Sequence, residues 1–468
     1  MDDRHGLSRI SRKVFAGVAM LLAAGAVRAE SLAPKINAIL NNDQLKNASV
    51  SVTIAEVTPR GLVEHFTHDP DLALAPASNT KLMTTACAFE KYGSKAAFKT
   101  TLYKVGEDLL IVGGGDPALG DARLAENPDK PAAIFELMAS ELVKAGVTKF
   151  RDLIIDDRVF DYQFTHPAWP DDQKLSEYEA PVGGLNFNAN CLDWKVVLSG
   201  DNVGVQIIPP TTYVSVAVKA TRGAKTAAWM YRPATSNKFE LRGTVAGTAK
   251  VAESVTILDP GLWTGTVARD TIVAVGVSST GRVRRLAATD DMSSAKVIAT
   301  ASTPVMNVIH RANKQSLNMM AEALCKRIGH DDTGKPGTWE NGTAAVMKYA
   351  VSCGAKSEDV FMDDGSGLSA KNRISSRAFT TVLAHVAASK EGELFVNSLA
   401  VPGEDGTLKR RFEGMSVASS VHAKTGHING VSTLSGYIDI KGAGGTTRRF
   451  VFSILCNKYV GNVNPLQD

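Results

Sequence analysis

The 468-residue chain is poor in cysteine, in aromatic residues and in excess charge: it has five cysteines, 6% aromatic residues and a formal net charge of +4. So few cysteines exclude a disulfide-dense miniprotein, and a hydrophobic fraction of 44% excludes a disordered chain. A small charge excess over this length argues against a phosphate-binding surface, so no nucleic-acid partner is expected. At about 150 residues per domain, the length predicts roughly two to four domains.

The chain also lacks long apolar runs, except near its N-terminus. Basic residues at positions 4, 9, 12 and 13 precede the uncharged run Val14–Val27, which ends at Val27-Arg28-Ala29. This layout is typical of a secretory signal peptide, and the run is too short to cross a bilayer as a helix. We predict that residues 1–29 are a signal peptide cleaved after Ala29 and that the protein is periplasmic; an uncleaved anchor or a buried helix is the alternative. Cleavage lowers the formal charge to about +1, and no integral membrane segment is expected in the mature chain.

The cysteine positions leave the disulfide pattern open. Cys325 and Cys353 are spaced for a bridge across a modest loop, and export permits disulfides. Cys87 and Cys456 lie in apolar surroundings and are expected to be core thiols.

Hydrophobic patterning predicts a mixed α/β chain. Helical periodicity is expected after Pro76 until Gly93, from Pro131 to Ala145 and from Met306 to Ile328. Residues 196–280 are rich in Val, Thr and Gly, which predicts a β-rich part. Further strands are predicted at Val50–Ile54, Asp108–Val112, Leu153–Ile155, Val431–Ile440 and Arg449–Leu455.

Several common enzyme signatures are missing. There is no His-Glu-x-x-His sequence, and His65 and His68 have no third ligand nearby, so no metal site is expected. The absence of a Gly-x-Ser-x-Gly elbow disfavours an α/β-hydrolase. Gly113–Ala118 resembles a dinucleotide loop only loosely, because Pro117 lacks the N–H that a phosphate needs. No cofactor is therefore expected.

Three short motifs remain, and they occur in the order Ser78-Asn79-Thr80-Lys81, Ser316-Leu317-Asn318 and Lys424-Thr425-Gly426. Ser-x-x-Lys also occurs at Ser293–Lys296, so this motif is weak by itself. Each motif alone is more often a helix cap, a surface position or a turn. Their order and contexts together point to a nucleophilic serine.

The first two motifs supply the groups that activate a serine. Residues three apart at a helix start share a face, so the Lys81 amine can reach the Ser78 hydroxyl. Lysine accepts the serine proton when its pKa is depressed, and we expect the helix N-terminus and Lys424 to depress it. Ser316 is expected to relay the proton to the leaving amine, and Asn318 to orient Lys81 and the substrate amide.

The third motif predicts a substrate-binding strand. An edge strand at Thr425–His427 is expected to pair with an extended peptide, and its N–H groups with that of Ser78 to stabilise an oxyanion. Thr425 and the positive charge of Lys424 suit a substrate carboxylate. Thr425, Gly426 and His427 are therefore the expected substrate-binding residues.

The motifs and their flanks resemble the D-alanyl-D-alanine carboxypeptidase/endopeptidase family of low-molecular-mass class C penicillin-binding proteins. The matching segments are Ala75–Leu82, Gly114–Pro117, Asn313–Asn318, Asp364–Ser369, Gly403–Leu408 and Lys424–Gly426. The resemblance implies Ser78 as the acylated nucleophile, Lys81 as its base, and Ser316 and Asn318 as the second motif. It implies Lys424 and Thr425 as contacts for the carboxylate and for β-lactams.

The resemblance also implies a fold and a domain plan. The expected fold class is α/β (α+β), with a transpeptidase-like domain in which helices flank an antiparallel sheet. Because Ser78 and Ser316 are 238 residues apart, a large insertion is expected between them. We predict a catalytic domain at 30–96 and 289–468 and an insertion at 97–288, in which a β-rich domain holds a nested α/β domain at about 128–195.

The implied function is a periplasmic serine DD-peptidase that cleaves peptidoglycan stem peptides and is acylated by β-lactams. A serine β-lactamase and a non-catalytic peptidoglycan-binding protein of the same fold are the alternatives; no Glu-x-x-Leu-Asn segment follows Ser316, which disfavours one β-lactamase class. His427 stands where relatives often carry a hydroxyl residue, and Ala370-Lys371 where they often carry Arg. Stem-peptide specificity, carboxypeptidase or endopeptidase preference and oligomeric state stay open.

Overall fold

The computed structural model describes residues 32–124, 127, 129–247, 252–442 and 445–468, so the predicted signal peptide lies outside the described residues. The chain divides into two compact units. The first unit comprises the chain up to Lys95, Ile309–Asp332 and Trp339–Asp468. The second unit comprises Ala96–Val308 and Thr333–Thr338. Among the described residues, no helix is both long and apolar enough to span a membrane.

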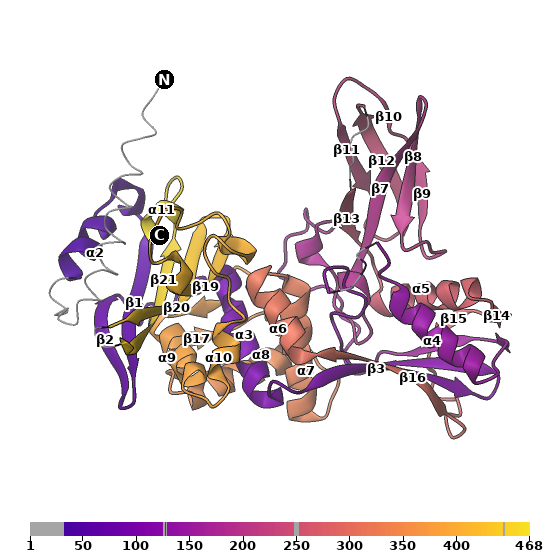
Figure 1. Ribbon diagram of the computed structural model, residues 1–468, viewed down its shortest axis with the longest axis horizontal. Helices are drawn as coiled ribbons and strands as arrows, with labels where there is room; N and C mark the ends of the chain where they lie inside the picture. Colours follow the sequence, from indigo (N-terminus) through magenta and orange to yellow (C-terminus); the bar gives the residue numbers. More distant parts are fainter. Residues whose placement is uncertain (1–31, 125–126, 128, 248–251, 443–444) are drawn as a thin grey trace. The chain divides into compact units, whose positions relative to one another are not determined.

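The first unit is built on one antiparallel sheet with strand order β19-β20-β21-β1-β2, seen side by side in Figure 1. Its strands are β1 (Ser49–Thr58), β2 (Gly61–His68), β19 (Val421–Ile428), β20 (Val431–Lys441) and β21 (Thr447–Asn457). Strands from the two ends of the chain therefore pair in one sheet, because β1 lies between β2 and β21. As predicted from the sequence, β19 is an edge strand.

Helices cover one face of this sheet. Ser51 and Thr53 of β1 lie 2.8 Å from Ser376 Oγ of α9, so these alternate residues face the helices. The helix α3 is buried from Thr80 to Phe89, and it ends at Gly93, whose φ of 74° few other residues adopt. The helices on this face are α3 (Thr80–Tyr92), α8 (Trp339–Ser352), α9 (Ser376–Ala387) and α10 (Gly392–Val396). The helix α7 (Asn318–Thr333) follows α6 (Val305–Lys314).

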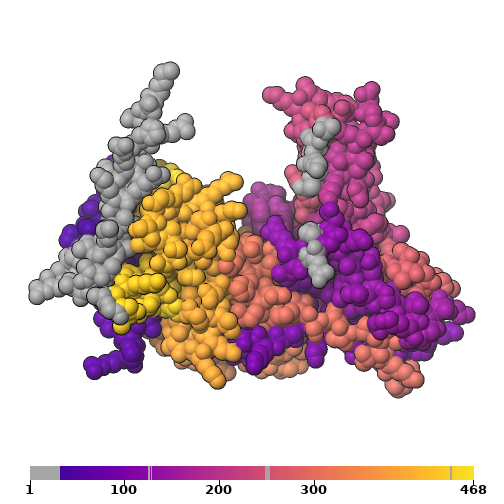
Figure 2. Space-filling view, in the orientation of Figure 1, coloured from indigo at the N-terminus to yellow at the C-terminus, as the bar shows by residue number. Residues whose placement is uncertain are grey.

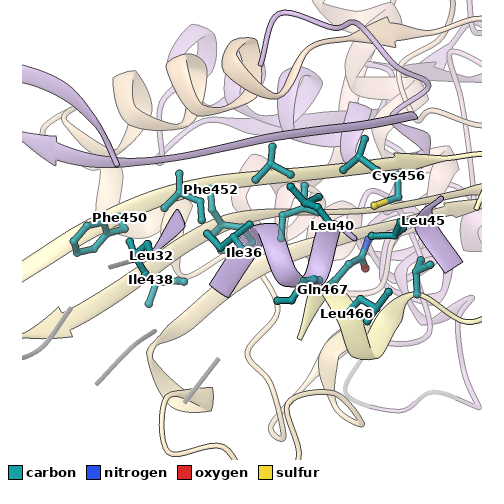
Figure 3. Close-up of a pocket in the computed structure, with 16 residues that line it drawn as sticks. Leu32, Ile36, Leu40, Leu45, Ile438, Phe450, Phe452, Cys456, Leu466 and Gln467 are labelled. Carbon is teal, nitrogen blue, oxygen red and sulfur yellow. The ribbon is translucent and has the colours of Figure 1, made fainter. Parts of the chain in front are cut away.

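The opposite face of the sheet is apolar and lies under α2 (Ala33–Leu40) and α11 (Asn464–Gln467). Val50 and Val52 of β1, which alternate with Ser51 and Thr53, line a cavity of about 80 Å³ there. Figure 3 shows Ile36 and Leu40 of α2 facing Phe450 and Phe452 of β21 across this space. The alternation of polar and apolar residues in β1 therefore assigns the two faces of the sheet.

The second unit contains a mixed sheet with strand order β15-β6-β4-β3-β16, in which β6 pairs in parallel with β4 and β15. Its strands are β3 (Ala97–Val105), β4 (Asp108–Gly113), β6 (Leu153–Asp156), β15 (Val283–Arg285) and β16 (Lys296–Pro304), with the short pair β5 (Lys149–Phe150) and β14 (Ser278–Ser279) alongside. Its helices are α4 (Ala133–Lys144) and α5 (Pro260–Ala274). Phe135 of α4 and Trp263 of α5 are fully buried in its core.

Two smaller sheets complete the second unit. Their strands β9 to β12, in magenta, project away from the helix α4 of the same unit in Figures 1 and 2. One sheet has the order β13-β7-β8, with β7 (Cys191–Ser199), β8 (Asn202–Ile208) and β13 (Ala252–Thr256). The other joins β9 (Ser215–Val218), β10 (Thr221–Arg222), β11 (Ala227–Tyr231) and β12 (Lys238–Val245). Trp194 and Leu241 of these sheets belong to the same core as Phe135, so the two small sheets share a hydrophobic interior with α4.

The nesting differs from the one predicted. Strands from both sides of the β-rich segment hydrogen-bond in the mixed sheet, so residues 191–256 are the nested part and the α/β layer surrounds them. In addition, β16 pairs with β3, which places residues 296–304 in the second unit rather than in the segment predicted from residue 289. The helix α5 also lies inside the stretch expected to be β-rich.

All five cysteines are free. The bridge considered between Cys325 and Cys353 is not formed: Cys325 is fully buried on α7 and Cys353 is partly exposed just after α8. Cys87 and Cys456 are buried thiols, as predicted.

Candidate active site

Ser78 and Lys81 lie next to each other at the start of α3. Ser78 is in the single 3₁₀ turn Ala77–Asn79, and Lys81 is in the first turn of the helix. The Nζ atom of Lys81 is 3.0 Å from Ser78 Oγ. The spacing of three residues therefore brings the amine to the hydroxyl, as the sequence predicts.

The turn that carries Ser78 is fixed to the central strand β20. Asn79 Nδ2 donates a hydrogen bond of 2.6 Å to Ser435 Oγ, and Thr433 Oγ1 donates one of 2.8 Å to Pro76 O. Ala77 has a φ of 46°, a left-handed conformation that is costly for a residue with a Cβ. The strand contacts hold this conformation and so fix the position of the Ser78 hydroxyl.

The Lys81 amine is buried and surrounded by acceptors. Besides Ser78 Oγ, its Nζ contacts Asn318 Oδ1 at 2.6 Å and Ser366 O at 2.9 Å. Burial lowers the pKa of Lys81, whereas the carboxylates of Glu322 and Asp364 raise it. A neutral amine in this position donates to Asn318 and Ser366 and keeps its lone pair for the Ser78 proton. Burial, which the sequence prediction did not include, is the largest cause of the depressed pKa of Lys81, and repulsion between Lys81 and Lys424 lowers the pKa of Lys424 as well.

Ser316 lies in a break between two helices, not within one helix as the pattern from Met306 to Ile328 predicts. The helix α6 ends at Lys314 and α7 begins at Asn318. Ser316 has a φ of 61°, which interrupts the right-handed helix. Its Oγ accepts a 2.8 Å hydrogen bond from Lys424 Nζ on β19.

Lys424 is the second buried lysine of the site. It has no exposed surface, and burial together with the charge of Lys81 holds its pKa well below the usual range. Its Nζ also donates to Thr425 O at 2.7 Å. Lys81 with Asn318, and Lys424 with Ser316, therefore form two amine centres in one unit, both made of residues singled out in the sequence.

The edge strand β19 passes close to the serine turn. A Cβ added at Gly426 would lie 2.7 Å from Pro76 O and 2.9 Å from Ser78 N, so only glycine permits this approach. Thr425 Oγ1 donates a 2.8 Å hydrogen bond to Thr407 Oγ1. His427 is exposed, and its Nδ1 lies 3.4 Å from the hydroxyl of Tyr459.

Glu322 and Trp339 were not singled out in the sequence, and Asp364 was quoted only as the start of the matching segment Asp364–Ser369. The carboxylates of Glu322 and Asp364 both act on Lys81. Glu322 follows Asn318 by four residues, so both lie on one face of α7, and both are buried. Burial raises the pKa of Glu322, and Asp364 raises it further. A carboxylate one helical turn after Ser-x-Asn was the signal available in the sequence.

One matching segment belongs to the second unit. Asp116 of Gly114–Pro117 is buried in the second unit, where its carboxylate accepts hydrogen bonds from Thr303 Oγ1 at 2.5 Å and Ala118 N at 2.9 Å. Burial raises its pKa to about 6. Its contacts there are those of a residue that braces the fold of that unit.

The arrangement can be compared with known proteins. The sequence model of the D-Ala-D-Ala carboxypeptidase 3 (S13) family matches residues 32–467. The chain belongs to this family. The family predicted from the motifs is therefore confirmed. The prediction that the chain is an enzyme of the serine D-Ala-D-Ala carboxypeptidase type is confirmed as well.

Individual relatives agree with the family. A D-alanyl-D-alanine carboxypeptidase of Actinomadura sp. (strain R39) is 30% identical over 466 residues, covering 94% of this chain and 83% of the relative. The D-alanyl-D-alanine carboxypeptidase DacB of Haemophilus influenzae is 22% identical over 380 residues, with 77% of each chain covered. The crystal structure of H. influenzae penicillin binding protein 4 (dacB) superposes with a TM-score of 0.76 at 19% identity, covering 92% of this chain and 96% of that chain. The predicted fold class is confirmed.

Gly426→Ala tests the close approach of β19 to Ser78. The added methyl group meets two backbone atoms that cannot move aside, so the strand is displaced and the rate of acylation by a fluorescent penicillin falls about 100-fold. Gly204→Ala on β8 is the control, since its Cβ has a nearest neighbour at 3.4 Å. An unchanged acylation rate in Gly426→Ala would show that acylation does not depend on the close approach of β19 to Ser78.

Proposed function

We propose that the chain cleaves D-Ala-terminated peptidoglycan stem peptides through an acyl-enzyme on Ser78. The observation that carries the proposal is the buried Lys81 amine, 3.0 Å from Ser78 Oγ and with a lowered pKa. Lys81 accepts the Ser78 proton as Oγ attacks the carbonyl carbon of the penultimate D-Ala. An ester forms, the C–N bond breaks, and the leaving amine takes up a proton.

Other residues of the site take parts that follow from their positions. The oxygen of the tetrahedral intermediate is held by the N–H groups of Ser78 and His427, which the close approach at Gly426 supports. Ser316, bonded to Lys424, passes the proton to the leaving amine. Thr425 and Lys424 attract the carboxylate of the terminal D-Ala. Water then hydrolyses the ester and frees Ser78.

Where the enzyme acts follows from the leader. We infer that residues 1–29 direct export and that the mature chain works in the periplasm on the peptidoglycan, because Val14–Val27 has the composition of a signal peptide. The first unit serves as the catalytic domain, since all the residues named in the reaction belong to it.

β-Lactams are proposed to acylate the same serine. A crystal structure of H. influenzae penicillin binding protein 4 (dacB) complexed with a novel β-lactam superposes with a TM-score of 0.70 at 18% identity. In this chain Lys424 and Thr425 suit the carboxylate of a β-lactam as they suit that of a peptide.

Ser78→Ala tests the nucleophile. Labelled penicillin followed by peptide mapping is expected to place the label on Ser78 in the wild type and to find none in the variant, because Ser78 Oγ is the hydroxyl that lies 3.0 Å from the Lys81 amine. Ser293→Ala is the matched control, since Ser293–Lys296 repeats the Ser-x-x-Lys pattern outside the site. A label that persists on Ser78→Ala would refute the assignment.

Lys81→Ala tests the base. Without an acceptor for the Ser78 proton, the acylation rate is expected to fall at least about 1,000-fold. Circular dichroism and thermal unfolding check that the variant is folded. Acylation of a folded variant at the wild-type rate would show that another group is the base.

Products on purified sacculi separate the reactions that share this site. Release of D-Ala identifies a carboxypeptidase, and opening of cross-links identifies an endopeptidase. Rapid turnover of nitrocefin in place of a stable adduct would favour a β-lactamase, and no release of either kind would favour a binding protein.

His427→Ala tests carboxylate recognition. Thr425 and His427 are two residues apart on β19, so their side chains lie on the same side of the strand. Loss of the imidazole is expected to raise KM for a D-Ala-D-Ala peptide about tenfold, with kcat changed less than about twofold, because the backbone N–H remains. His68→Ala on β2 is the control. A fall in kcat of about tenfold with an unchanged KM would contradict this role.

A further inference from the structure

A buried carboxylate, Glu322, lies beside the amine of Lys81. Glu322 has no exposed surface. Its Oε2 accepts hydrogen bonds from Trp339 Nε1 at 2.7 Å and from Gly365 N at 2.9 Å, and its Oε1 accepts one from Ser366 N at 2.8 Å. A carboxylate is buried at acceptable cost only with such partners, so the surroundings of Glu322 are built for it.

Ser366 connects Glu322 to Lys81. Its N–H donates to Glu322, and its carbonyl oxygen accepts from Lys81 Nζ at 2.9 Å. The three acceptors around Lys81 are Ser78 Oγ, Asn318 Oδ1 and Ser366 O. Glu322 therefore acts on the amine through its charge and through the backbone of Ser366, without touching the reacting atoms.

The charges around Lys81 come from three elements. The helix α7 supplies the charge of Glu322, with the Cys325 thiol and the Lys326 amine one turn further along the helix, and β19 supplies that of Lys424. The loop after β17 (Val360–Phe361) supplies Asp364. Lys326 Nζ lies 3.7 Å from the centre of the Trp339 ring, on the residue that also bonds Glu322.

The carboxylates of Asp364 and Glu322 accept hydrogen bonds from different parts of the first unit. The Asp364 carboxylate accepts from Gly367 N and Ser369 N, both at 2.7 Å, and from Asn372 Nδ2 at 2.9 Å, so it shapes its own loop. Glu322 instead joins α7 and Trp339 of α8 to that loop at the residue that contacts Lys81. Of the two carboxylates, Glu322 is the one bonded to the backbone that Lys81 uses.

We propose that Glu322 is a positioning residue that stabilises the Lys81 ammonium formed when Ser78 loses its proton. The proposal rests on the proposed role of Lys81 as the base. During acylation the proton moves from Ser78 Oγ to Lys81 Nζ, which places a positive charge in a buried site. The Glu322 carboxylate offsets this charge, and through Ser366 it keeps the amine directed at Ser78. After the proton passes on to the leaving amine, Lys81 is neutral again.

Glu322→Gln tests the proposal through the pH dependence of acylation. Removing a nearby negative charge lowers the pKa of Lys81, so the acidic limb of the acylation rate is expected to move to lower pH by about one pH unit. A less basic amine also accepts the proton less readily, so the rate at the plateau falls about threefold or more. Labelled penicillin measures the rate on the folded protein at each pH.

The control and the contrary outcome are defined by the same measurement. Glu340→Gln changes an exposed glutamate in α8 and is expected to leave the profile unaltered. A purely structural role for Glu322 lowers the plateau and leaves the acidic limb in place, which would overturn the proposal. If the wild type itself is not acylated at Ser78, the proposed function fails instead, so the two failures are distinguishable.

A second measurement needs no variant at Glu322. In wild-type protein carrying ¹³C at lysine Cε, the Lys81 signal, assigned by its loss in Lys81→Ala, is expected to titrate in two steps, because it senses Glu322 as well as its own proton. A single-step curve would refute the coupling even if Glu322→Gln does not fold.

Discussion

The burial of the Lys81 amine is the constraint on which the first unit depends. A buried amine needs acceptors, and here they come from its own turn, from a residue 237 positions later and from one 285 positions later. The same burial lowers its pKa, which is what a lysine needs in order to accept a proton. Packing and reactivity therefore have one origin: the segments that must meet to bury Lys81 are those that present Asn318 and Ser366 to it.

Backbone conformation and hydrogen bonds leave the Ser78 and Ser316 hydroxyls few positions that they can adopt. Two left-handed residues, Ala77 and Ser316, set the positions of the Ser78 and Ser316 hydroxyls, and neighbouring strands hold the backbone around them. Ser435 Oγ accepts a hydrogen bond from Asn79 Nδ2 and donates one of 2.8 Å to Ser453 Oγ on β21. A series of buried hydrogen bonds therefore runs from the serine turn across two strands. Buried hydrogen bonds thus tie the serine turn to the sheet.

Local spacing made part of this predictable. Helix geometry places residues three apart on one face, so the contact between Ser78 and Lys81 could be predicted from their spacing. The edge strand β19 could be predicted because Lys424-Thr425-Gly426 stands just before the last two strand patterns. Glu322 was missed because a lone glutamate in a helix is usually solvated, and its partners come from Trp339 and Gly365, remote in sequence. The helix α5 was missed because Gly261, Gly265 and Ala268 are buried along with its large residues, which removes the polar stripe that marks a helix. The nesting depends on long-range strand pairing, which periodicity does not report.

The pairing of β1 with β21 has a consequence for how the protein matures. Glu56 and Arg448, bonded at 2.6 Å, are 392 residues apart, so the central sheet closes only when nearly the whole polypeptide is available. Contacts of such separation slow folding, because a long loop must be ordered before they form. A nascent chain that already holds Ser78 and Lys81 therefore lacks the finished sheet to which their turn is bonded until its last strands have been made.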